Sequence, residues 1–324
     1  MPAALLEIRN LKTYFFIREG VAKAVDGVDL FVRRGETVAL VGESGCGKSV
    51  TAYSILRLIP SPPGKIVAGE IFFAGEDLLL LPEHRLREIR GNEISMVFQD
   101  PLTSLNPVFR IGAQVAEVLQ VHRSLRKQDA LEYTIKLLKD VGIPAPEQRI
   151  RDYPHQMSGG MRQRVMIAMA LACEPQLIIA DEPTTALDVT VQAQILELLH
   201  GLKKSRDMAL LLITHDLGVV AETAQRVAVM YAGRIMEQAD VAALFQNPLN
   251  PYTRGLLASL PRSGEKRLTP IKGMVPPILE LPHGCKFNTR CPSVFDRCLQ
   301  EEPRLLPVNS SAAQQHLVRC WLHQ

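Results

Sequence analysis

A glycine-rich loop near the N-terminus has the residue types that hold phosphate groups. It runs from Gly42 to Ser49 (GESGCGKS), after the short apolar segment 36–41 and before an expected helix. Backbone N–H groups without bulky side chains can close around phosphate oxygens, and the dipole of the following helix favours negative charge. Lys48 adds a mobile cation, and Ser49 offers a hydroxyl to a magnesium ion. The loop by itself predicts a phosphorylated ligand.

Two carboxylates follow a later apolar segment, Leu177–Ala180. Asp181 is placed to bind the same hydrated Mg²⁺ ion, usually through water. Glu182 can direct its carboxylate at an attacking water molecule, because neighbouring residues at a strand end point in different directions. An isolated Asp-Glu pair is most often surface decoration. Its position after an apolar strand and downstream of a complete phosphate loop favours a general base at Glu182.

Two polar side chains end other expected strands. Gln99 follows 94–98 and stands where the core meets a helical insert, so we expect it to sense the terminal phosphate and to approach the Mg²⁺ ion. His215 comes shortly after 209–213. A histidine is more often a hydrogen-bonded structural residue, but the carboxyl edge of a parallel sheet favours contact with the terminal phosphate.

Length and composition indicate a globular protein of about two domains. The chain has 324 residues, of which 47% are hydrophobic, and a net charge of +3, which gives no reason to expect a nucleic-acid partner. Its longest apolar run, Val165–Cys173, is far below the roughly 18 residues of a membrane span. The N-terminal ten residues do not resemble a signal peptide, so we expect a cytosolic protein whose six cysteines are reduced or metal-bound.

The order of the patterns indicates an α/β fold with a mostly parallel sheet. Segments typical of strands occur at 6–9, 24–32, 36–41, 69–73, 94–98, 177–180, 209–213 and 226–230. The segment 69–73, followed by Ala74-Gly75, predicts an antiparallel arm, and helical spacing predicts an inserted helical subdomain at about 100–165. Prolines become frequent after 246, so we expect a core domain at 1–245 and a C-terminal extension at 246–324.

The C-terminal extension contains Cys285, Cys291, Cys298 and Cys320 in a proline-rich segment with little apolar periodicity. Such a segment has a small core, and a metal site could stabilise its fold. The gaps between the cysteines are wider than in most zinc sites, and four thiolates also suit a [4Fe-4S] cluster. Spacing leaves iron-sulfur and zinc equally favoured, with free thiols as a third possibility.

A five-residue segment rich in small residues, Met157–Met161 (MSGGM), lies between the phosphate loop and the Asp181-Glu182 pair in the sequence. A chain that has this pentad, the phosphate loop and the acidic pair resembles the ATP-binding cassette ATPases, here over residues 4–245. The resemblance implies two cassettes arranged head to tail, with each ATP held between the phosphate loop of one chain and the pentad of the other. It also implies a Q-loop at Gln99, a D-loop at 186–188 and a switch histidine at His215. The implied nucleotide-binding residues are Tyr14 or Phe15 on adenine, and Gly42, Ser44, Gly45, Cys46, Gly47, Lys48, Ser49, Val50, Ser158, Gly159, Gly160 and Asp188.

Within the cassette family, the chain is similar to the ATPase subunits of bacterial dipeptide and oligopeptide importers. The segments that carry this likeness are Phe98–Pro107, Tyr153–Gln156, Asn250–Thr253 and Arg290-Cys291-Pro292. That likeness implies a peripheral protein at the cytoplasmic face of the membrane. Its implied partners are a second ATPase subunit, identical or paralogous, two transmembrane permease subunits and, indirectly, an extracytoplasmic substrate-binding protein. It also favours the [4Fe-4S] cluster over zinc.

Alternative functions are open at this point. Importers of nickel, glutathione or sugars use similar ATPase subunits. A soluble cassette protein that acts on nucleic acid or ribosomes fits less well, because such proteins usually carry long coiled coils or tandem cassettes. A regulatory cassette without hydrolysis is disfavoured because Lys48, Asp181, Glu182 and His215 are all present.

Overall fold

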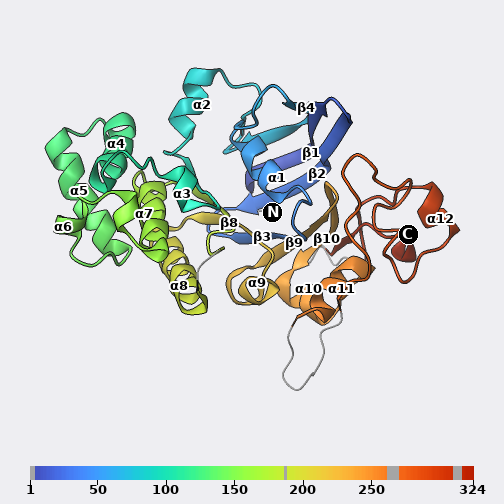
Figure 1. The fold of residues 1–324 in the computed structure, drawn as a ribbon. Helices are drawn as coiled ribbons and strands as arrows, with labels where there is room; N and C mark the ends of the chain where they lie inside the picture. Colours follow the sequence, from blue (N-terminus) through green and yellow to red (C-terminus); the bar gives the residue numbers. More distant parts are fainter. Residues whose placement is uncertain (1–3, 186–187, 261–269, 309–315) are drawn as a thin grey trace. The chain divides into compact units, whose positions relative to one another are not determined.

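The computed structural model describes residues 4–185, 188–260, 270–308 and 316–324, and it consists of two compact units. The first unit comprises Met1–Arg33, Thr37–Leu80 and Ile213–Gln324, and the second comprises Arg34–Glu36 and Leu81–Leu212. Figure 1 shows the helices and strands of both units, with labels where there is room. The predicted α/β class is confirmed, whereas the domain boundary near 246 stays a prediction.

A four-stranded antiparallel sheet forms the predicted arm in the first unit. Its strands are β1 (Ala4–Ile17), β2 (Gly20–Arg33), β4 (Gly64–Phe73) and β5 (Glu76–Asp77), in the order β2-β1-β4-β5. Alternating apolar residues turn one face of β1 and β2 inward, which is the period-2 pattern seen in the sequence. The first two strands form a long hairpin that extends well beyond the predicted 6–9 and 24–32.

Five further strands of the first unit are joined edge to edge. They are β3 (Thr37–Val41), β9 (Arg226–Tyr231), β10 (Arg234–Asp240), β11 (Leu306–Pro307) and β12 (Leu317–Val318), in the order β11-β12-β10-β9-β3. The pair β3 and β9 is parallel, whereas the β9-β10, β10-β12 and β11-β12 pairs are antiparallel. Both β3 and β9 are buried along their whole length, as expected for strands covered on two faces.

Strand β10 is a strand that the sequence did not predict. Its central residues include Glu237 and Gln238, which are polar yet buried. Glu237 is fully buried because its carboxylate accepts hydrogen bonds from the backbone N–H groups of Leu249 (2.8 Å) and Asn250 (2.9 Å). His316 Nε2 lies 2.6 Å from the same carboxylate. Partners distant in sequence therefore make these polar residues compatible with a core strand.

Short helices complete the first unit. They are α1 (Lys48–Ile55), α9 (Leu217–Thr223), α10 (Val241–Gln246), α11 (Pro251–Ala258) and α12 (Asp296–Gln300), with a 3₁₀ turn at Trp321–His323. Helix α1 begins at Lys48, at the end of the phosphate loop, where the sequence predicts a helix.

The second unit contains parallel strands and most of the longer helices. Strand β6 (Ile94–Val97) pairs in parallel with β7 (Leu177–Asp181), and β8 (Ala209–Thr214), which crosses into the first unit, is the other neighbour of β7. The helices are α2 (Glu83–Ile89), α3 (Pro101–Ser104), α4 (Ile111–Arg123), α5 (Lys127–Asp140), α6 (Pro146–Arg149), α7 (Gly159–Leu171) and α8 (Val189–Arg206), with a 3₁₀ turn at Pro154–Gln156.

Helices α4, α5, α6 and α7 pack on one another and fill the region of the predicted helical insert (Figure 1). Among the described residues, no helix is both long and apolar enough to cross a lipid bilayer.

Three aromatic rings join the C-terminal region to the core of the first unit. Tyr231 ends β9, Tyr252 lies in α11, and Phe287 belongs to the cysteine-containing segment. Their ring centroids are 4.7 to 5.3 Å apart, in tilted and edge-to-face arrangements. Such pairs stabilise a fold beyond the area that they bury. Phe287 therefore anchors the segment 285–291 to the core.

Replacing Phe287 with alanine should destabilise the first unit by about 3 kcal/mol, because a buried phenyl ring leaves a cavity. The expected result is a fall of several degrees in the midpoint of thermal unfolding, measured by calorimetry. Leu299→Ala is the matched control, because the Leu299 side chain is 53% exposed and its loss should cost less than about 0.5 kcal/mol. Equal midpoints for the two variants would show that the aromatic cluster does not stabilise the unit.

Candidate functional site

The predicted site residues divide between the two units. The first unit holds Tyr14, Phe15, the phosphate loop, His215 and the four C-terminal cysteines, and the second holds Gln99, the MSGGM pentad, Asp181, Glu182 and Asp188. Residues 186–187 of the predicted D-loop lie outside the described residues.

The phosphate loop passes close to the backbone of neighbouring strands. Gly42 has φ of 156°, and a Cβ atom there would lie 2.1 Å from the carbonyl oxygen of Met230 in β9. Gly47 has φ of 110°, and its Cβ would lie 2.3 Å from the carbonyl oxygen of Ala24 in β2. Both positions therefore require glycine, since any side chain would displace backbone.

Lys48 lies within the phosphate loop and is 5% exposed. Its Nζ donates hydrogen bonds to the carbonyl oxygens of Gly42 (2.9 Å) and Glu43 (3.1 Å). The ammonium group is therefore held in the curve of the loop, where a phosphate would be bound. Cys46 is 1% exposed, and burial raises the pKa of its thiol to about 11. Such a thiol is neutral near pH 7, as expected of a small packing residue.

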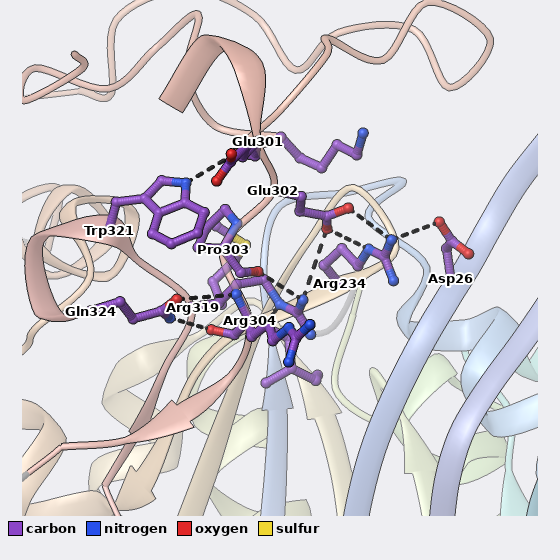
Figure 2. Close-up of polar contacts among 12 residues, drawn as sticks. Asp26, Arg234, Glu301, Glu302, Pro303, Arg304, Arg319, Trp321 and Gln324 are labelled. Atoms are coloured by element: carbon purple, nitrogen blue, oxygen red, sulfur yellow. Dashed lines mark hydrogen bonds and ion pairs between the residues drawn. The ribbon is translucent and has the colours of Figure 1, made fainter. Parts of the chain in front are cut away.

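Tyr14 and Phe15, the two candidates for adenine stacking, have different surroundings. The Tyr14 hydroxyl donates a hydrogen bond of 2.5 Å to Asp26, and burial, with this bond, raises the pKa of Tyr14 to about 12. Asp26 pairs with Arg234 (3.0 Å), which also pairs with Glu302 of the C-terminal region at 2.7 Å (Figure 2). The Tyr14 hydroxyl is thus part of an ionic network.

Two donors orient the carboxylate of Glu182 in the second unit. Gln99 Nε2 donates to Glu182 Oε2 at 3.2 Å, and Thr185 Oγ1 donates to the same oxygen at 2.9 Å. Glu182 has φ of 46°, a left-handed conformation that is unfavourable for residues other than glycine. Asp181, at the end of β7, is fully buried. The structure therefore brings Gln99 and Glu182 together.

The pentad and Asp188 both begin helices. The Ser158 hydroxyl accepts a hydrogen bond from the Met161 backbone N–H (3.3 Å) at the start of α7, and Gly159 and Gly160 form the first helical residues. Asp188 accepts from the Val191 N–H (2.9 Å) at the start of α8. N-terminal capping is thus a structural role for both side chains, while small residues leave the helix N-terminus accessible to an anion.

His215 follows β8 directly, as predicted, and its side chain is exposed. The next residue, Asp216, caps α9 by accepting hydrogen bonds from two backbone N–H groups. The cap fixes the turn that carries His215 at the carboxyl end of the strand.

The prediction of an iron-sulfur cluster in the C-terminal region is wrong. Within the described ranges, no three or more His, Cys, Asp or Glu side chains are grouped so that they could hold a metal ion, and this removes the support for zinc as well. The four cysteines, Cys285, Cys291, Cys298 and Cys320, line one small pocket. Burial raises the pKa of Cys285 to about 11. Burial also raises the pKa values of Cys291 and Cys320.

Other contacts hold this segment in place without a metal. Phe287 packs in the core, and the Asn288 amide donates to the carbonyl oxygen of His283 at 2.7 Å. Arg319 donates to the carbonyl oxygens of Ile235 and Pro303, and Trp321 donates to that of Glu301 (Figure 2). The prediction assumed that this segment needs a metal ion to stabilise its fold, but packing and hydrogen bonds stabilise it instead.

Sequence reasoning missed two residues that contact the predicted site. Thr185 bonds Glu182, and Arg290 of the C-terminal region forms an ion pair with Glu43 of the phosphate loop. A threonine three residues after the acidic residue in a turn is a weak local signal for the first contact. The second joins residues 247 positions apart, so no local pattern could have indicated it.

The chain is similar in sequence and in structure to known proteins. A family described as ABC transporter matches residues 25–185, and one described as oligopeptide/dipeptide transporter, C-terminal region, matches residues 236–298. The oligopeptide transport ATP-binding protein AppD of Bacillus subtilis is 53% identical over 99% of this chain and 98% of its own length. The probable peptide ABC transporter ATP-binding protein y4tR of Sinorhizobium fredii is 53% identical over 98% of this chain and 94% of its own length.

Among solved structures, the chain resembles the ATP-binding cassette MJ0796 in a dimeric, post-hydrolysis state bound to ADP and phosphate. The TM-score is 0.66 at 28% identity, over 73% of this chain and 98% of the other. The family match over residues 25–185 includes the phosphate loop, Gln99, the pentad and the Asp181-Glu182 pair. The chain belongs to the ABC transporter family and is an ATP-binding cassette ATPase.

Proposed function

We propose that this protein hydrolyses ATP to power the import of dipeptides or oligopeptides through a membrane transporter. The observation that carries the proposal is the hydrogen bond between Gln99 and Glu182. The bond joins the carboxylate of Glu182, which is placed to activate water, to Gln99, which precedes the helical region. Hydrolysis of the nucleotide beside Glu182 can thereby shift the helices after Gln99, and these helices could move a partner subunit. Relatives named as oligopeptide and peptide ATP-binding proteins, similar over nearly the whole chain, support peptide as the cargo.

The phosphate loop binds the β- and γ-phosphates of ATP in this proposal. Lys48 and the backbone N–H groups between Gly42 and Ser49 supply positive charge and hydrogen bonds. The ring of Phe15 or that of Tyr14 stacks on adenine.

Mg²⁺ fits the oxygen donors that the chain offers. Ser49, Gln99 and the buried carboxylate of Asp181 provide a hydroxyl, an amide and a carboxylate oxygen, which are hard ligands suited to this ion. When bound, the ion would neutralise charge on the β- and γ-phosphates.

Hydrolysis in this proposal depends on Glu182 as the general base. Glu182 removes a proton from water, and the water oxygen attacks the γ-phosphorus as the bond to the β,γ-bridging oxygen breaks, which gives ADP and phosphate. Gln99 and Thr185, which donate to Glu182, keep its carboxylate oriented toward that water. His215 contacts the γ-phosphate from the end of β8 and favours the charge that develops there.

Two cassettes act together in the proposed transporter. Ser158, Gly159 and Gly160 at the start of α7 contact the γ-phosphate of ATP bound to a second cassette, either an identical chain or a paralogue, and Asp188 stands beside this contact. ATP therefore favours the closed pair, because only closure adds these interactions. Two permease subunits receive the motion at the cytoplasmic face of the membrane, and an external binding protein delivers the peptide. Nucleic acid has no part in the cycle.

Glu182→Gln should lower the kcat for ATP hydrolysis by about 10² to 10⁴, because the amide cannot accept the proton from water. ATP binding should remain, since the substitution keeps the shape and the hydrogen bonds of the side chain. Steady-state phosphate release and fluorescence titration with a nucleotide analogue measure the two quantities. Glu174→Gln, at an exposed glutamate paired with Arg123, is the matched control and should hydrolyse normally. Normal turnover by Glu182→Gln would refute the assignment of the base.

The cargo and the partners are tested in cells that lack the native gene. Expression of the full chain should restore uptake of isotope-labelled di- or oligopeptides, and the Glu182→Gln variant should not. Mass spectrometry of the purified membrane complex should detect two permease subunits and two ATPase subunits. Restored uptake of nickel, glutathione or a sugar instead of peptide would contradict the proposed cargo. Purification with nucleic acid or ribosomes and without permeases would contradict the transport function.

A further inference from the structure

A partly buried ion pair joins the C-terminal region to the phosphate loop. The two terminal nitrogens of Arg290 lie 2.7 and 2.9 Å from the two carboxylate oxygens of Glu43, the second residue of the loop. This bidentate geometry is the strongest form of the arginine-carboxylate pair. The Arg290 side chain is 3% exposed and that of Glu43 is 28% exposed, so water screens the interaction only in part.

Arg290 is held in place independently of Glu43. Its Nε donates to the carbonyl oxygen of Lys272 at 3.2 Å, and one terminal nitrogen donates to the Tyr231 hydroxyl at 3.5 Å. The guanidinium also lies 5.7 Å from the centroid of the Tyr231 ring and 5.9 Å from that of Phe287. These contacts fix the cation before it meets the carboxylate, so little conformational freedom is lost in forming the pair.

Glu43 is in turn connected to the group that would hold phosphate. Its backbone N–H donates to the Tyr252 hydroxyl at 3.0 Å, and its carbonyl oxygen accepts from Lys48 Nζ at 3.1 Å and from the Cys46 N–H at 3.3 Å. The side chain, the N–H and the carbonyl oxygen of Glu43 are therefore all bonded. The C-terminal half of the first unit supplies two of the partners, Arg290 and Tyr252.

A carboxylate is an unfavourable side chain beside a polyanion. Like charges a few ångströms apart repel, and water screens a partly exposed carboxylate only in part. The guanidinium of Arg290 balances the charge of Glu43 and holds its carboxylate in one place. An arginine remains charged at any physiological pH, so this compensation is permanent.

We propose that Arg290 is a positioning residue of the nucleotide site: by neutralising and anchoring Glu43, the C-terminal region sets the affinity of the phosphate loop for ATP. The inference rests on the proposed function insofar as this loop is taken to bind ATP. The C-terminal region would thus affect nucleotide binding through the contact between Arg290 and Glu43, which both belong to the first unit.

The test measures the Kd of the full chain for the fluorescent analogue TNP-ATP, together with the kcat and KM for ATP. Arg290→Met should raise the Kd and the KM about tenfold, because the phosphate loop then carries one uncompensated negative charge, and should leave kcat within about twofold. Arg290→Lys keeps the charge and should stay within about threefold of the unmodified chain. The double variant with Glu43→Gln and Arg290→Met carries neither charge and should also return to within about threefold. Arg304→Met, at an exposed arginine of the same region, is the control and should change nothing.

The outcomes separate this inference from the proposed function. Failure of the unmodified chain to bind TNP-ATP, or binding that survives Lys48→Ala, would count against the nucleotide site itself. Normal binding by a folded Arg290→Met variant, or a double variant as weak as Arg290→Met, would overturn the role of Arg290. If Arg290→Met does not fold, Glu43→Gln decides, because removal of the balanced charge should tighten binding. Unchanged or weaker binding by Glu43→Gln would then overturn the inference.

Discussion

A loop that binds phosphate through its backbone must be nearly bare of side chains, and it therefore has little of its own to hold its shape. In this protein other parts of the first unit hold the loop. Met230 and Ala24 approach so closely that Gly42 and Gly47 can carry no side chain. The Tyr252 hydroxyl and the Arg290 guanidinium bind Glu43, the one long acidic residue of the loop. The C-terminal region is in this sense part of the framework of the phosphate loop.

In the second unit, neighbouring residues likewise hold the proposed general base in place. Glu182 occupies a strained left-handed conformation directly after β7, and hydrogen bonds from Gln99 and Thr185 hold its carboxylate there. Strain of this kind persists only where the surroundings determine the geometry. Because Gln99 lies between β6 and the helices that follow it, the orientation of the base depends on the position of the residue that leads into those helices. This dependence provides a physical basis for coupling hydrolysis to motion.

The sequence predicted what is encoded locally. The parallel strands β3, β7 and β9 are continuous apolar runs, and the phosphate loop and the start of α7 follow from glycine and serine at fixed spacing. Strand β10 was missed because Glu237 looks exposed until Leu249, Asn250 and His316 are known to contact it.

The C-terminal region was the hardest part to predict. The cysteine spacing and the family resemblance suggested a metal staple, yet Phe287 and the Arg319 contacts hold the segment. Arg290 was recognised only as part of a family motif. Its partner Glu43 is 247 residues away, and only the folded chain brings the two together.

The most direct measurement is a structure of the assembled complex with a non-hydrolysable ATP analogue. It should show the triphosphate bound to the loop 42–49 of one chain and to Ser158, Gly159 and Gly160 of another cassette, with the carboxylate of Glu182 beside the water that faces the γ-phosphorus. A triphosphate enclosed by a single chain, with the pentad remote from any nucleotide, would contradict the account.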